Sequence, residues 1–142
     1  MNNFKRIADL RIDNDLTQIK LAEILNIKSD RYSKWEKGSN NMPIEYLIKL
    51  SIIYDVSIDY ILELSDKKTN SFKNYIDPKN LPKKLKEFRN KLNLSQEAFS
   101  KKIGISQRTY SYIEQGIRKI NIVDIYIIAS TNDISADKLL SK

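Results

Sequence analysis

The chain carries the stretch ISQRTYSYIEQG at residues 105–116, and a related stretch, IKSDRYSKWEKG, at residues 27–38. Sliding the sequence along itself by 78 positions aligns residues 5–64 with residues 83–142 without a gap, and 14 of the 60 aligned pairs are identical. A repeating unit of this length is too long for a solenoid repeat, whose period is about 20–50 residues. The sequence therefore predicts two similar domains in tandem.

The predicted boundaries place the first domain at residues 1–64, a linker at 65–82 and the second domain at 83–142. The linker, SDKKTNSFKNYIDPKNLP, is polar and rich in Asn and Lys, and two prolines interrupt it, which is typical of a loop segment. As a flexible coil it would span about 25 Å, and stretched about 60 Å. We expect it to be only lightly tethered, through Phe72, Tyr75 and Ile76.

Helical periodicity dominates both units. In the first unit, apolar residues recur at helical spacing, for example at Leu21, Ile24 and Leu25. Hydroxyl residues stand where helix N-caps are expected, and Pro43 is placed to open the fourth helix. These caps are Thr17, Ser57, Ser95 and Ser135. The pattern predicts an all-α fold with five short helices per unit, in the first unit near 4–13, 17–25, 29–36, 43–54 and 57–63.

The composition restricts the classes of function. The chain has neither His nor Cys, so it lacks the usual general base, thiolate metal ligands and disulfides. The sequence also shows no glycine-rich phosphate loop, and we expect no enzymatic activity, no cofactor and no metal. No apolar run approaches the about 18 residues that a membrane span needs, and the N-terminal residues lack a signal-peptide core. We expect a cytoplasmic protein that makes no membrane contact.

The net charge of +7 favours a polyanionic partner, nucleic acid first and an anionic membrane second. The alternative is that lysines only keep the surface soluble. The excess is uneven, since residues 1–64 hold nine Lys and Arg against ten Asp and Glu, whereas residues 83–142 hold twelve against six. Any electrostatic attraction to a polyanion is therefore expected mainly from the second unit.

The two units share a series of residue types at fixed spacing. The first unit reads LTQ at 16–18, LA at 21–22, LNI at 25–27, YS at 32–33, WE at 35–36 and Gly38; the second reads LSQ at 94–96, FS at 99–100, IGIS at 103–106, YS at 110–111, IE at 113–114 and Gly116. Together with the closing VSIDYIL and ISADKLL, this pattern closely resembles the Cro/phage-repressor (XRE) family of helix-turn-helix DNA-binding domains. The resemblance covers about 60 residues twice and implies two tandem five-helix lambda-repressor-like domains joined by a polar linker.

The physical chemistry of the pattern agrees with a helix-turn-helix. A tight turn between two helices favours Gly104, which adopts positive φ freely, and Asn26 is the next best residue for this geometry. Small residues, Ala22 and Ser100, would let the helices approach closely. We expect a buried core role for Tyr32, Trp35, Tyr110 and Ile113. The resemblance further suggests structural ion pairs that join Arg11 to Glu36 and Arg89 to Glu114.

In this family the third helix of each domain enters the major groove. By position, the resemblance implies that bases are read by Gln107, Arg108, Thr109 and Tyr112 in the second unit, and by Ser29, Asp30, Arg31 and Lys34 in the first. These side chains suit the task, since Gln can bond adenine, Arg can bond guanine and the Thr methyl can touch thymine. Phosphate contacts are expected from Gln18 and Gln96, which begin the second helices, and from Arg118 and Lys119.

The two units differ at the predicted interface. The second has Ser106 as a ready N-cap, whereas the first has Lys28 there and presents Asp30, which phosphates repel. Asn40 and Asn41 replace the basic pair Arg118 and Lys119. Phosphate neutralisation dominates DNA affinity, so we expect the second unit to supply most of the binding.

The leading interpretation is a sequence-specific transcriptional regulator of double-stranded DNA, in particular a repressor. One chain could occupy two half-sites in direct repeat, or a homodimer could use one reading helix per chain on a palindrome; the sequence leaves both open. The alternative function is an antitoxin-like or regulator-binding interaction module that uses the fold to dimerise, which the apolar stretch LIKLSIIY favours. No separate ligand-sensing domain fits in the remaining residues, so no small-molecule ligand is evident.

Overall fold

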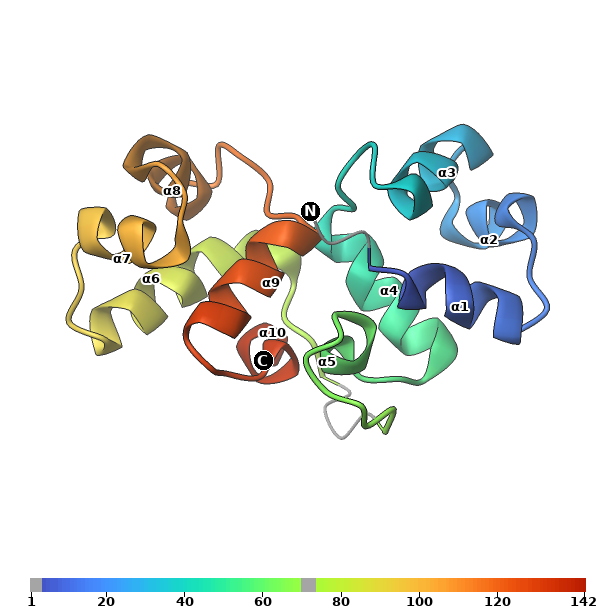
Figure 1. The fold of residues 1–142 in the computed structure, drawn as a ribbon. Coiled ribbons are helices and arrows are strands. Elements are labelled where there is room, and N and C mark those ends of the chain that lie inside the picture. The colour runs from blue at the N-terminus through green and yellow to red at the C-terminus, as the bar shows by residue number, and fades with distance from the viewer. Residues whose placement is uncertain (1–3, 70–73) are drawn as a thin grey trace.

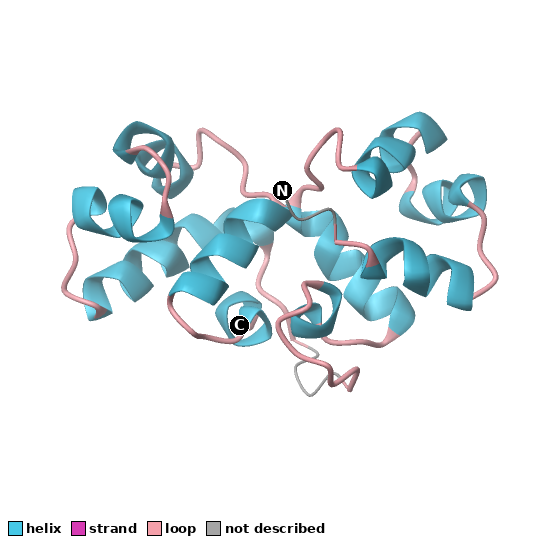
Figure 2. Cartoon of the chain, viewed as in Figure 1, coloured by secondary structure: helices cyan, strands magenta, loops and turns pink. Residues whose placement is uncertain are grey.

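The computed structural model describes residues 4–69 and 74–142 as helices joined by short loops (Figures 1 and 2). Within that part of the chain only isolated bridges occur in place of strands, so the predicted all-α fold is confirmed. The first unit holds α1 (Arg6–Asp13), α2 (Gln18–Leu25), α3 (Ser29–Lys37), α4 (Ile44–Tyr54) and α5 (Ile58–Ile61). The second begins with the 3-10 turn η1 (Pro78–Asn80) and holds α6 (Leu81–Lys91), α7 (Gln96–Ile103), α8 (Gln107–Glu114), α9 (Ile122–Thr131) and α10 (Ala136–Leu140).

Side-chain caps fix where most of these helices begin. The predicted caps are confirmed, because each hydroxyl accepts a hydrogen bond from a backbone N–H in the first turn; they are Thr17, Ser57, Ser95, Ser106 and Ser135. Lys28 precedes α3 and makes no such bond, as expected of a residue without a cap acceptor. Asn121 adds a capping box at α9, in which Asp124 accepts from the Asn121 N–H.

The turn inside each helix-turn-helix has the expected left-handed residue. Gly104 has a φ of +82° and Asn26 a φ of +57°. Ala22 and Ser100, on the helices before these turns, are both buried. The two turns therefore have the same backbone geometry, although a glycine occupies only the second.

Two largely buried ion pairs tie the first helix of each unit to the third. Arg11 Nε lies 2.7 Å from Glu36 Oε2, and Arg89 Nε lies 2.7 Å from Glu114 Oε2. Both pairs were expected and are confirmed. The predicted core role of the aromatic and apolar positions is confirmed as well, since Tyr32, Trp35, Tyr110 and Ile113 are all buried.

The two units pack against each other at the middle of the molecule. α4 contacts α9 and α5 contacts α10, while the helix-turn-helix pairs lie at the two outer ends (Figure 1). The buried apolar side chains of both units form one continuous cluster. The tandem domains therefore make one compact body.

A short antiparallel bridge joins matched positions of the two units. Pro43 pairs with Asn121, its counterpart 78 positions later. The bonds on either side are reciprocal, because the Ile44 N–H donates to the Ile120 carbonyl at 3.1 Å and the Ile122 N–H donates to the Met42 carbonyl at 2.8 Å. Antiparallel pairing of two equivalent segments is the pattern of a local twofold axis.

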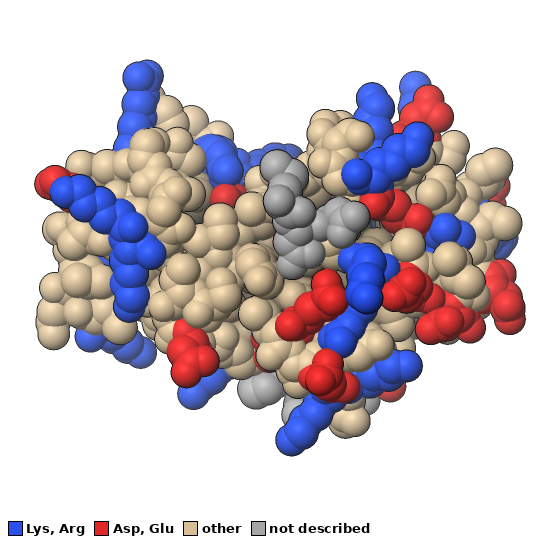
Figure 3. Space-filling view, in the orientation of Figure 1, with Lys and Arg blue, Asp and Glu red and all other residues tan. Residues whose placement is uncertain are grey.

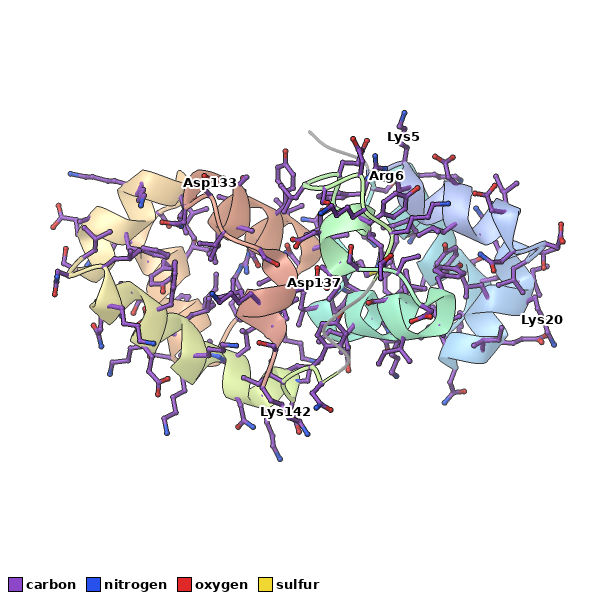
Figure 4. The ribbon with its side chains drawn as sticks, turned by 90° about the horizontal axis from the view of Figure 1, so that it is seen from below. Lys5, Arg6, Lys20, Asp133, Asp137 and Lys142 are labelled. Carbon is purple, nitrogen blue, oxygen red and sulfur yellow. The ribbon has the colours of Figure 1, made fainter. Side chains whose placement is uncertain are left out.

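A second reciprocal contact joins α5 and α10. The Asp137 carboxylate accepts from the backbone N–H groups of Ile58 and Asp59, both at 2.8 Å. The Asp59 carboxylate accepts in turn from the Ala136 N–H at 2.6 Å and the Ser135 hydroxyl at 2.5 Å. Asp137 lies at the centre of the molecule when it is viewed from below (Figure 4). The units are thus related by an approximate twofold axis at two separate places.

The segment between the units is packed over the part that the structure describes, which differs from the flexible coil expected from its composition. Tyr75 is buried, and its hydroxyl donates to Asp137 Oδ1 at 2.7 Å and lies 3.0 Å from the Ser51 hydroxyl. The Ile76 N–H donates to the Leu140 carbonyl. Phe72 lies outside the described residues. No helix in the described part of the chain has the length and apolar character needed to cross a membrane.

Candidate nucleic-acid interface

α3 and α8 lie on the same side of the molecule, at its two ends (Figure 1). α5, α10 and the C-terminus lie on the opposite side. α3 packs against α2, and α8 packs against α7. The side chains on the inner faces of both helix pairs are buried. The fold therefore presents both third helices to one surface, as a pair of reading helices requires.

The predicted reading positions of α8, Gln107, Arg108, Thr109 and Tyr112, give the outer side of this helix a polar surface. Gln107 and Arg108 are exposed, and Thr109 and Tyr112 are half-buried. Arg108 Nε donates to the Tyr112 hydroxyl at 3.1 Å, and its guanidinium carbon lies 5.6 Å from the centre of that ring. At the start of the helix, the Ser106 hydroxyl donates to Thr109 Oγ1 at 2.8 Å and accepts from the Thr109 N–H at 3.1 Å. This surface offers guanidinium, amide, hydroxyl and methyl groups, which suit base edges.

The predicted reading positions of α3, Ser29, Asp30, Arg31 and Lys34, have different chemistry because they include an acidic side chain. Asp30, Arg31 and Lys34 are exposed and Ser29 is half-buried. The Arg31 guanidinium carbon lies 5.1 Å from the ring centres of both Trp35 and Tyr46, and Nη1 lies 3.4 Å from the Tyr46 hydroxyl. Sequence reasoning missed Tyr46, because the repeat places an aspartate, Asp124, at its counterpart.

The predicted phosphate-contacting glutamines are engaged inside their own units. Gln18 Nε2 donates to Glu36 at 3.1 Å, and Gln96 Nε2 donates to Glu114 at 3.1 Å. Burial would raise the pKa of Glu114, but hydrogen bonds from Arg89 and Gln96 and the positive charge of Arg89 outweigh it and lower that pKa below its ordinary value. Each glutamine therefore ties the start of its helix to a charged carboxylate, and leaves its amide oxygen for another donor.

The two basic residues after α8 differ in their surroundings. Arg118 makes a two-pronged ion pair with the buried carboxylate of Asp124, with Nη1–Oδ2 at 2.7 Å and Nη2–Oδ1 at 3.0 Å. Its side chain remains 35% exposed. Lys119 is exposed. Arg118 thus anchors the loop to α9 through the capping-box residue, and Lys119 is the freer cation of the two.

The charges are distributed unevenly over the molecule. In the view of Figure 3, acidic side chains gather over the first unit, whereas the second unit shows few of them. The upper edge of the surface dips between the lobes that carry α3 and α8. The net positive charge of the chain therefore lies mostly in the second unit, in agreement with the charge count of the two halves.

Both units match one protein-family model, described as helix-turn-helix, at residues 7–61 and 85–139. An uncharacterized HTH-type transcriptional regulator of Bacillus subtilis, YobD, is 36% identical over 95 residues, which is 67% of this chain and 78% of that protein. The HTH-type transcriptional regulator ImmR of B. subtilis is 38% identical over 58 residues, 41% of this chain and 46% of its own length. The cryptic phage CTXphi transcriptional repressor RstR of Vibrio cholerae is 34% identical over 65 residues, 46% of this chain and 57% of its own. No solved structure matches the chain significantly.

Proposed function

Because the chain belongs to the helix-turn-helix family, whose model matches both of its units, we propose that it is a sequence-specific double-stranded DNA-binding transcriptional regulator. The α3 and α8 reading positions contact base edges in the major groove, and the starts of α2 and α7 with Lys119 contact phosphates. Repression is the simplest mode of action, since bound protein excludes other proteins from its site. The relatives that carry regulator or repressor names support this proposal.

The placement of α3 and α8 on one side of a single body carries the proposal. Two reading helices that serve one duplex must face it together, about 34 Å apart for successive major grooves. The second unit contributes most of the affinity, because it holds twelve Lys and Arg against six Asp and Glu. The first unit contributes less, because it holds nine Lys and Arg against ten Asp and Glu.

An interaction module is the alternative that the apolar stretch LIKLSIIY of α4 favours. In the structure α4 packs against α9 of the same chain, and Leu47, Ile48 and Leu50 are buried there or in the unit's own core. Much of the apolar surface that would pair with a partner is thus used within the chain, which favours the DNA-binding function.

Selection of bound duplexes from a random DNA pool at moderate salt tests the proposal. The intact chain is expected to enrich a defined motif, and Arg108→Ala is expected to lose preference at part of it. Lys142→Ala, at the C-terminus on the opposite side from α3 and α8, is the matched control and should enrich the same motif as the intact chain. Enrichment of no motif would contradict the proposed function.

A further inference from the structure

We propose that one chain occupies a complete operator by itself, as a built-in pseudo-dimer, and reads two unlike half-sites in inverted order. This inference rests on the proposed function and specifies the DNA that the function requires. It replaces the two arrangements that the sequence leaves open, a direct repeat bound by one chain and a palindrome bound by two chains, with an inverted repeat bound by one chain.

The inverted order follows from the two reciprocal contacts between the units. The bridge at Pro43 and Asn121 and the exchange between Asp59 and Asp137 both relate equivalent residues by an approximate twofold rotation. A twofold rotation that carries the first unit onto the second also carries α3 onto α8, with the direction along the DNA reversed. A direct repeat would instead need a translation, which these contacts do not allow.

The interface between the units, formed by the Asp137 hydrogen bonds and the α4–α9 contact, stabilises this arrangement. Asp137 is 1% exposed and accepts three hydrogen bonds, from two backbone N–H groups of the first unit and from Tyr75 of the connecting segment. Rearrangement to a direct repeat would uncover this carboxylate and its donors, and also the buried α4–α9 contact. Breaking such charged hydrogen bonds is costly, so the twofold arrangement is the one expected on DNA.

The unlike half-sites follow from the residues at the reading positions. The repeat matches Ser29 with Gln107, Asp30 with Arg108, Arg31 with Thr109 and Lys34 with Tyr112, so all four pairs differ. At the second position the chemistry is opposite, since an aspartate only accepts hydrogen bonds whereas an arginine only donates them. Aspartate suits the amino group of cytosine and arginine suits the acceptors of guanine. The two ends of the operator are therefore read by different rules.

A pair of matched substitutions tests whether α8 and α3 each read a different half-site. Arg108→Ala is expected to relax base preference in one half of the selected motif, and Asp30→Ala in the other half. The measured mass of the protein–DNA complex should correspond to one chain per duplex. Two chains that each read with α8 would lose preference in both halves together when Arg108 is replaced. That result, or two chains per duplex, would overturn the inference.

A graft tests the orientation directly. The chain with Ser29→Gln, Asp30→Arg, Arg31→Thr and Lys34→Tyr carries the α8 reading positions on both helices, and none of these four side chains is buried. We expect it to bind an inverted repeat of the α8 half-site, about 10 base pairs between centres, about tenfold or more tightly than the same elements in direct repeat. A preference for the direct repeat, or equal binding of one element and two, would overturn the inference.

Failure of the inference is separable from failure of the function. If the intact chain selects no motif, the proposed function falls and these arrangements do not arise. If it selects a motif and the graft prefers a direct repeat, the function stands and the inverted arrangement falls. Circular dichroism of the graft and of both single variants confirms that each remains helical before binding is measured.

Discussion

The carboxylates of Asp59 and Asp137, 78 positions apart in the chain, each accept a backbone hydrogen bond at the start of the helix that carries the other. Burial raises the pKa of Asp59, with the neighbouring Asp137 acting in the same direction and the bonds from Ser135 and Ala136 opposing it. The exchange places two carboxylates beside each other, which is tolerable because five donors among the described residues bond to them.

Replacement of Asp137 by alanine is expected to lower the free energy of unfolding by about 3 kcal/mol, because it leaves buried donors of α5 and Tyr75 without their acceptor. Urea denaturation measures the change. Asp13→Ala, at an exposed position in α1, is the control and should change stability by less than about 0.5 kcal/mol. Equal effects of the two variants would contradict the structural role of Asp137.

Replacement of Glu114 by glutamine is expected to cost about 3 kcal/mol at neutral pH, because it leaves Arg89 buried without its counter-charge. The folded-state pKa of Glu114 is lowered, so its contribution is full above the ordinary value of 4.5 and is lost as the pH falls through the lower folded-state value. The stability difference between the intact chain and Glu114→Gln should therefore shrink below pH 4.5.

The control for this pH dependence is Glu97→Gln. Glu97 is 64% exposed and pairs with Lys101 along one helix, so its replacement should cost less than about 0.5 kcal/mol at neutral pH. Denaturation curves of all three proteins between pH 3 and pH 7 make the comparison. A difference for Glu114→Gln that stays constant over this range would contradict the assignment.

Exchanges at the left-handed turn residues, Gly104 and Asn26, are expected to change stability in opposite directions in the two units. Gly104→Ala is expected to cost about 1–2 kcal/mol, since the φ of +82° disfavours a side chain. An added Cβ would meet no atom within 4 Å, so the cost is one of backbone conformation and not of crowding. Asn26→Gly should instead be neutral or stabilising, by up to about 1 kcal/mol. Thermal unfolding of both variants tests the pair, and destabilisation by Asn26→Gly would contradict it.

Replacement of Lys119 by alanine is expected to change the salt dependence of DNA binding. If Lys119 contacts one phosphate, Lys119→Ala should weaken binding to all sequences alike and reduce the slope of log affinity against log salt by about 1. Arg118→Ala should also destabilise the fold, because it leaves the buried Asp124 carboxylate unpaired. Titrations at several salt concentrations, with a melting curve for each variant, separate the two effects. An unchanged slope for Lys119→Ala would exclude the phosphate contact.

Much of each unit was predictable because its signals are local. The hydroxyl caps, the left-handed turn residues and the Arg–Glu spacing each act within a short stretch or recur at the same place in both units. Arg118 shows the limit of such reasoning. Its position in the family pattern predicts a phosphate contact, whereas its ion pair with Asp124, six residues later, has no sequence signature.

The contacts between the units could not be predicted in the same way. Asp59 and Asp137 were visible as an identical pair, but their acidic character near a helix start is explained equally well by their own helix dipoles. The connecting segment is polar on average, which predicts a loose linker. In the structure the buried Tyr75 bonds to Ser51 of the first unit and Asp137 of the second, and a backbone bond from Ile76 to Leu140 adds to this attachment. Contacts between segments 60–80 residues apart depend on the assembled surfaces rather than on any one stretch.

Because the two units are covalently joined and packed together, dilution does not separate them as it separates the subunits of a noncovalent dimer. Their mutual concentration is set by the chain, and their association costs no translational freedom at each binding event. The melting temperature should accordingly be independent of protein concentration. On DNA, occupancy should rise along a simple saturation curve from the lowest protein levels, without the threshold that assembly from two molecules imposes.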